Sequence, residues 1–325
     1  MDMAWAQPAG MSTAQALDTY GVAVVPGCLT GARLEAAQHD IPGAFEYMTQ
    51  EWDTPFLVNG GRAEQRAASD FLFPSHRQLY QSPPCLGHCQ AVWDVRQDPA
   101  VAQVFADIHA VPKEGLVVSF DGVGILPPPE NTGVGWQQGG WMHMDTSYRK
   151  PQHCTQGLVN LFDVHPGDAT LTALLGSHKL VEEAAAAFEM PLPDKSFNFL
   201  KSVDGLKEWY IERGCQEVRV LAPAGAVVCW NTRTVHSGCN PIVGREHPSW
   251  RCVVYVCMMP RSSCTDKALA RRVDIWRKGR MTGHYAADPH MFPATPRTYG
   301  KETKQVSVLA RAELTRLGKR LVGLP

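Results

Sequence analysis

The chain has 325 residues, of which 44% are hydrophobic and 19% are charged, and its formal net charge is −1. This composition supports a sizeable core and argues against wholesale disorder, and the near-zero charge favours neither a nucleic-acid binder nor an enzyme for strongly acidic substrates. The N-terminus lacks the basic and apolar regions of a signal peptide, and no stretch of about 18 apolar residues exists, so we expect a cytoplasmic protein. Several of the ten cysteines lie in apolar runs, which is typical of small core residues in a reducing compartment.

Helices are expected mainly in the first third of the chain. Residues 13–25 predict a short helix followed by a strand, and residues 30–40 predict a second helix. Residues 98–110 predict a third helix, with Asp98 as its N-cap and a proline at its first position.

From residue 115 onward, short apolar runs alternate with Gly, Pro and Asp, which is typical of antiparallel strands in a sandwich or barrel. The runs are LVVSFDGVGIL, QGLVNLFDV, ATLTALLG, QEVRVLAP, GAVVCWNT and WRCVVYVCMM. A helix is expected at 179–190 within this β region. The fold class is therefore mainly β with flanking helices.

The last 65 residues differ from the rest in charge. Residues 261–325 contain 14 Lys or Arg against 5 Asp or Glu, and residues 265–280 and 307–321 look helical. We interpret them as a basic helical extension with a solvated face, although a patch that attracts an anionic substrate or partner is also open. The chain is expected to form a single domain over 1–325, with its core at about 15–260.

The sequence WMHMDTSY at 141–148 suggests a metal site. Side chains at positions i and i+2 of a strand share a face, so His143 and Asp145 would point together and Met144 away from them. A distant histidine, His236, follows the strand GAVVCW, 91 residues after Asp145. Two histidines and one carboxylate form the facial triad of non-haem Fe(II) oxygenases, because the opposite face of the metal stays open for chemistry.

A cationic side chain supports the same reading. Arg251 opens the apolar strand WRCVVYV, 15 residues after His236. A keto-acid co-substrate such as 2-oxoglutarate needs a buried partner for its far carboxylate, and arginine provides a planar, bidentate one. Arg245 is the competitor for this role, but it lies in a polar loop, GREHPS, and is expected to be exposed.

Further residues could line the site. Asn160 and Thr172 lie on expected core strands and could donate to the co-substrate, although ordinary strand positions explain them as well. Trp141, Tyr148 and Arg149 flank the ligands and could contact substrate. Arg233 could anchor an anionic group or hold the turn before His236.

On these motifs the sequence resembles the phytanoyl-CoA dioxygenase family over most of residues 15–260. Four segments resemble motifs of the family: YGVAVVPGCLTGARL, WMHMD, ATLTALLGSHK and GAVVCWNTRTVHSGCNP. In the third segment, Leu175 stands where the family has proline. The resemblance implies a double-stranded β-helix (jelly-roll, cupin-like) core, Fe(II), 2-oxoglutarate and O2. It also implies oxidation of a small-molecule substrate with release of succinate and CO2, and a carboxylate at 145 favours hydroxylation over halogenation.

Three alternatives remain open at this stage. One is a non-catalytic jelly-roll that senses a metal or small molecule, and another is a cupin-like enzyme that uses O2 without 2-oxoglutarate. The third is an oxygenase that acts on a macromolecule through its basic C-terminal region. The substrate and the oligomeric state cannot be inferred from the sequence, because substrate pockets are built from variable loops.

Overall fold

The computed structural model describes residues 3–71, 86–136, 142–145, 154–189, 204–293 and 304–325. Its strands are β1 Met3–Trp5, β2 Val22–Val25, β3 Leu116–Val118, β4 Val123–Leu126, β5 Thr155–Asn160, β6 Thr170–Leu175, β7 Gln216–Val220, β8 Val227–Asn231, β9 His236–Cys239, β10 Arg251–Tyr255 and β11 Met258–Pro260. Its helices are α1 Thr13–Tyr20, α2 Gly31–Thr49, α3 Arg62–Phe71, α5 Gln90–Arg96, α6 Pro99–His109, α7 Pro129–Thr132, α8 Val181–Ala187, α9 Leu206–Glu212, α10 Asp266–Arg277 and α11 Arg316–Val322.

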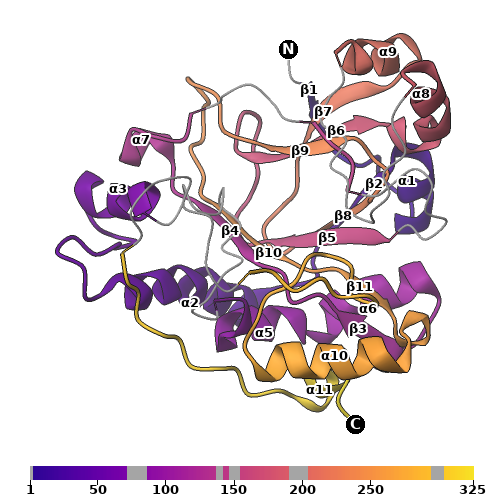
Figure 1. The fold of residues 1–325 in the computed structure, drawn as a ribbon. Coiled ribbons are helices and arrows are strands. Elements are labelled where there is room, and N and C mark those ends of the chain that lie inside the picture. Colours follow the sequence, from indigo (N-terminus) through magenta and orange to yellow (C-terminus); the bar gives the residue numbers. More distant parts are fainter. Residues whose placement is uncertain (1–2, 72–85, 137–141, 146–153, 190–203, 294–303) are drawn as a thin grey trace.

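Two sheets face each other to form the centre of the molecule (Figure 1). The larger has five strands in the order β2-β8-β5-β10-β4, and the smaller has four in the order β1-β7-β6-β9. Their pairings are antiparallel except for that of β1 with β7. Neighbours in each sheet are far apart in sequence, as in a jelly roll, so the expected double-stranded β-helix core is confirmed.

The space between the sheets is filled by alternate residues of both. Val22, Leu158, Ala173 and Val228 belong to one buried cluster that contains side chains from both sheets. The residues in between point outward, as the period of two in a strand requires. Each strand therefore has an inner face toward the other sheet and an outer face toward helices.

Helices cover the outer face of the larger sheet, where α2, α5, α6, α10 and α11 lie together (Figure 1). The largest buried cluster joins this layer to the sheet, and it includes Phe105 of α6, Val254 of β10 and Leu321 of α11. Helix α6 begins as expected, because the side chain of Asp98 accepts hydrogen bonds from the first backbone N–H groups. On the outer face of the smaller sheet lie α8 and α9.

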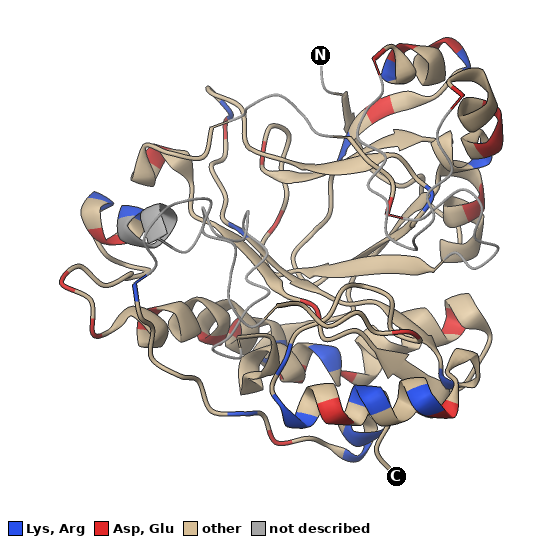
Figure 2. Cartoon of the chain, viewed as in Figure 1, with Lys and Arg blue, Asp and Glu red and all other residues tan. Residues whose placement is uncertain are grey.

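The C-terminal region is less helical than expected. Helix α10 confirms the prediction for 265–280, but only the end of the 307–321 prediction is helical, as α11. Residues 304–315 run extended along the helix layer instead, where the backbone N–H of Ser307 donates to Met48 and that of Ala312 donates to His88. Helix α10 carries more basic than acidic residues (Figure 2), and its exposed basic residues are Lys267, Arg271 and Arg277.

One buried arginine side chain ties the C-terminal region to the rest of the molecule. The guanidinium of Arg272 on α10 donates to the carbonyl oxygens of Val118 at 2.5 Å, of Leu321 at 2.9 Å and of Ala286. Three separate segments thus meet at one side chain.

Within the described part of the chain, no helix is long and apolar enough to cross a membrane.

Candidate metal centre

Residues 142–145 form a short extended segment beside β9. The backbones of His143 and His236 exchange two hydrogen bonds of 2.9 Å, which makes them a directly opposed antiparallel pair. Their side chains therefore lie side by side, with ring centroids 4.6 Å apart. The backbone N–H of Asp145 donates to Thr232 at 3.2 Å, which places the carboxyl on the same face as His143.

The tight turn between β8 and β9 orients His236. The backbone N–H of Arg233 donates to the side chain of Asn231, and that of Thr234 donates to the carbonyl of Asn231 at 2.8 Å. The Nδ1 of His236 lies 2.8 Å from the carbonyl oxygen of Thr234. Because a carbonyl can only accept, Nδ1 carries the proton and Nε2 keeps its lone pair.

The three side chains approach one another as ligands of one cation would. Asp145 Oδ1 lies 3.3 Å from Nε2 of His143, and Asp145 Oδ2 lies 3.4 Å from Nε2 of His236. One ligand atom from each residue lies within 4.8 Å of the others. Metal–ligand bonds of about 2.0–2.2 Å separate ligands at right angles by about 3 Å, so these residues fit an iron ion.

The site is buried, and its electrostatics suit a metal. Burial raises the pKa of Asp145, but the adjacent imidazoles of His143 and His236 and the charge of His284 outweigh it and hold the pKa well below its usual range. Burial lowers the pKa of His236, although Asp145 opposes this effect. The carboxylate is thus ionised and His236 neutral, which are the forms that bind a metal.

Two donors that the sequence analysis did not single out hold the ligands. Gln156 on β5 donates from Nε2 to Oδ2 of Asp145 at 2.7 Å, and Trp230 on β8 donates from its indole N–H to Nε2 of His236 at 3.1 Å. Gln156 and Trp230 are directly paired across the two strands, so their side chains share the inner face. A metal and the Trp230 N–H would use the same lone pair of His236.

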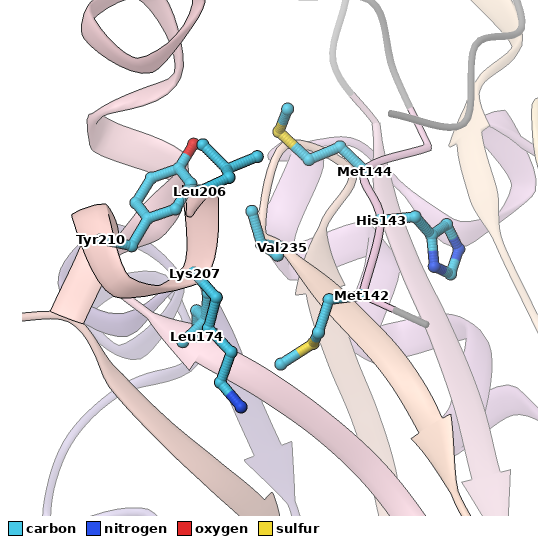
Figure 3. A pocket seen from close by; sticks show the side chains of 8 residues that line it. All are labelled: Met142, His143, Met144, Leu174, Leu206, Lys207, Tyr210 and Val235. Atoms are coloured by element: carbon cyan, nitrogen blue, oxygen red, sulfur yellow. The ribbon is translucent and has the colours of Figure 1, made fainter. Parts of the chain in front are cut away.

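The opposite face of the 142–145 segment is apolar. Met142 and Met144 point away from His143 into a pocket under α9 (Figure 3). Leu174 of β6 and Tyr210 of α9 line the same pocket. The alternation expected from the sequence, with Met144 opposite the ligands, is therefore confirmed.

Arg251 begins β10 on its inner face. It is two residues before Val253, which lies in the inner cluster, so both side chains point toward the other sheet. Its guanidinium is partly buried and makes no hydrogen bond or ion pair with the residues that the structure describes. Asn160 on β5 is paired with Val253 and is buried on the same face.

The remaining expected residues are placed differently. Ala173 pairs with His236, so residue 173 lies on the inner face of β6 with the ligands. Thr172 pairs with Ser237, and its buried side chain therefore lies on the outer face. Arg233 forms an ion pair with Glu182 of α8. Trp141, Tyr148 and Arg149 lie outside the described residues.

The expectation that Arg245 is exposed is wrong. Its side chain is only 1% exposed and forms ion pairs with Asp168 at 2.7 Å and Glu130 at 2.8 Å. The polar loop folds over these two carboxylates, which come from distant parts of the sequence. Since both partners use its guanidinium, Arg245 is not free to bind a co-substrate.

Comparison with known proteins gives the same fold and family. The family model described as phytanoyl-CoA dioxygenase (PhyH) matches residues 17–240. "Ava biosynthesis cluster protein O" of Aspergillus versicolor is 28% identical over 212 residues, which cover 63% of this chain and 64% of that protein. The chain therefore spans a little under two thirds of the length of this curated relative.

Two solved structures share most of the architecture. The hypothetical protein JW0805 from Escherichia coli has a TM-score of 0.60 at 17% identity, over 97% of this chain and 82% of that chain. A putative oxidoreductase from Salmonella typhimurium LT2 has a TM-score of 0.56 at 15% identity, over 97% of this chain and 83% of that chain. At these identities the structures show the fold alone. The family match over residues 17–240 and the His143, Asp145 and His236 triad together show that the chain belongs to the phytanoyl-CoA dioxygenase family of non-haem iron, 2-oxoglutarate-dependent oxygenases.

Proposed function

We propose that the protein is an Fe(II)- and 2-oxoglutarate-dependent dioxygenase that hydroxylates a small molecule with release of succinate and CO2. The observation that carries this proposal is the mutual approach of His143, Asp145 and His236 on one buried face. When bound, iron and the keto acid supply the oxidising chemistry with O2. The residues of the protein bind the iron and the keto acid, orient the substrate and exclude water from the site.

Arg251 is proposed to bind the far carboxylate of 2-oxoglutarate. A partly buried guanidinium on the inner face, with no partner among the described residues, supports this role because an unpaired charge there is costly. Asn160, on the same face, is proposed to donate to the co-substrate. Thr172 is not included in this proposal, because the register places its side chain on the other face of β6.

The substrate is proposed to be a small organic molecule. The name of the Aspergillus relative refers to a biosynthesis cluster, which is consistent with such a substrate. The basic surface of α10 lies with the helix layer rather than between the two sheets, and this location gives no support for a macromolecular substrate (Figure 2).

We infer that residues 1–325 form a single oxygenase domain. Ile275, Ala312 and Leu321 of the C-terminal region belong to the same buried cluster as Ile125 of β4 and Val254 of β10. A shared core of this kind favours one folding unit over a separate extension.

The direct test is succinate release from labelled 2-oxoglutarate with Fe(II), first alone and then with a metabolite screen. Substrate-stimulated succinate is expected for the wild type. An Arg251→Gln variant should raise the KM for 2-oxoglutarate by about ten- to a hundredfold, because a hydrogen bond to a charged group contributes about 1.5–3 kcal/mol.

Two outcomes contradict the proposal. No succinate with any substrate points to a sensor. Full activity of Arg251→Gln without added 2-oxoglutarate points to an oxygenase that needs no keto acid.

A further inference from the structure

The segment that follows α10 is fixed against the sheets by its backbone. The backbone N–H of Thr282 donates to Phe120 at 2.9 Å, and its hydroxyl accepts from the N–H of Phe120 at 3.0 Å. Gly283 and His290 close a loop through a further backbone bond of 3.1 Å. These residues lie beyond the 17–240 range that the family model matches.

This segment packs close to the metal ligands. Tyr285 is buried in one cluster with Cys154, which directly precedes β5. The backbone N–H of Cys154 donates to the hydroxyl of Thr232 at 3.3 Å, and the carbonyl of Thr232 accepts from Asp145. A chain of contacts through Cys154 and Thr232 therefore links the segment to the backbone of Asp145.

His284 is the residue of the segment that can act at the site. Its Nε2 atom is buried and has no hydrogen-bond partner in the described part of the chain. A buried polar atom without a partner calls for an explanation, and a ligand that completes its hydrogen bonding is one such explanation. The charge of this imidazole also contributes to the electrostatics of Asp145, after burial and the two neighbouring histidines.

The neighbouring donors are already used. The amide of Gln156 donates to Asp145, and the indole of Trp230 donates to His236. 2-Oxoglutarate bound at the metal would place its metal-proximal carboxylate near Asp145. The oxygen atoms of this carboxylate keep lone pairs, which need hydrogen-bond donors in a buried site. Arg251 is assigned to the opposite end of the same molecule.

We propose that His284 is a further co-substrate-binding residue, whose Nε2–H donates to the metal-proximal carboxylate of 2-oxoglutarate. This inference rests on the proposed function, and it gives the C-terminal segment a direct part in the active site. Arg251 and His284 then hold the two ends of one dicarboxylate.

The test measures binding rather than turnover. Mn(II) affinity is determined by calorimetry, and 2-oxoglutarate affinity by anaerobic titration of the Fe(II) protein, followed by its visible charge-transfer absorption. His284→Phe keeps a ring but loses the donor, and it should weaken 2-oxoglutarate binding by about ten- to a hundredfold with Mn(II) affinity unchanged. His284→Gln should restore part of the loss.

Two comparisons make the result specific. His290→Phe, an exposed change in the same segment, should bind 2-oxoglutarate like the wild type. Succinate lacks the metal-proximal keto acid, so its affinity should fall in Arg251→Gln but not in His284→Phe.

Wild-type affinity for 2-oxoglutarate in His284→Phe overturns the inference, and so does an equal loss of Mn(II) binding, which indicates a structural role. If the wild-type protein itself binds no 2-oxoglutarate, the proposed function fails and this inference fails with it.

Discussion

The two faces of the 142–145 segment have opposite environments within one stretch of chain. On one face His143 and Asp145 meet His236 in a buried, polar arrangement. On the other face Met142 and Met144 pack against Leu174 and Tyr210 (Figure 3). Function and stability are thereby assigned to alternate residues, so substitutions on the two faces should have separable effects.

Removal of a ligand should give the largest effect. His236→Ala leaves two ligands, and activity should fall on the order of a thousandfold or more, because the metal contributes several kcal/mol to catalysis. Succinate release measures the loss, and near-ultraviolet circular dichroism should report a folded protein. His39→Ala, at an exposed histidine, is the control and should be fully active. Retained activity in His236→Ala would disprove the assignment of this ligand.

The apolar face should respond in stability instead. Met144 is 1% exposed, and Met144→Ala should lower the free energy of unfolding by about 2–5 kcal/mol through lost packing and a residual cavity. Urea denaturation measures the change. Met3→Ala, at a residue 48% exposed, should change little. The separation of the two faces is wrong if Met144→Ala abolishes metal binding while the protein stays as stable as the wild type.

His88 is a third buried histidine, and it shows that burial alone does not make a histidine a metal ligand. His88 lies in the helix layer, where its Nε2 is 2.8 Å from the carbonyl of Arg280 and its Nδ1 accepts from Trp93 at 3.4 Å. Burial lowers the pKa of His88 to about 4, with the bond to Arg280 opposing this. Both ring nitrogens are used, so this histidine should contribute to pH-dependent stability and not to metal binding.

The sign of that dependence follows from proton uptake. Below about pH 6.5 the unfolded chain takes up a proton at His88, but the folded chain does so only near pH 4. Stability attributable to His88 is thus complete above pH 6.5 and should fall by about 3 kcal/mol as the pH drops to 4. Denaturation at several pH values measures it. His88→Gln should show a correspondingly flatter profile, and an unchanged profile in this variant contradicts the prediction.

The smallest expected effect concerns the support of the ligands. Gln156→Leu removes the donor to Asp145, and metal affinity should fall by about ten- to a hundredfold. Calorimetric titration with Mn(II) is the measurement. Gln97→Leu removes a glutamine of similar burial that is bonded to Thr315, so it serves as the matched control. Equal Mn(II) affinities in the two variants would show that Gln156 only fills space.

Strong local patterns in the sequence predict much of the fold and the grouping of His143, Asp145 and His236. His143 and Asp145 follow from strand alternation, and His236 follows a recognisable strand and turn. Gln156 was missed because one polar residue in a strand looks like many others until the partner strand is known. The position of His284 near the site depends on how the chain folds back after α10, and no periodicity shows that.

Two errors have the same physical origin. Arg245 was expected to be exposed because its loop is polar, but Glu130 and Asp168 arrive from far along the sequence and bury it. Residues 304–315 were expected to be helical in part, but their backbone pairs with other segments of the helix layer. In both cases tertiary partners override the local preference.

The guanidinium of Arg272 donates its hydrogen bonds to main-chain oxygen atoms, those of Val118, Ala286 and Leu321. Every amino acid provides such an oxygen, so these three hydrogen bonds depend on the path of the backbone, while core packing separately constrains the buried side chains of Val118, Ala286 and Leu321. The donor position has no comparable tolerance, because lysine cannot present the same planar fork. Among the residues of this attachment, Arg272 is therefore the one whose side-chain chemistry is fixed by hydrogen bonding, and the other residues are constrained by packing.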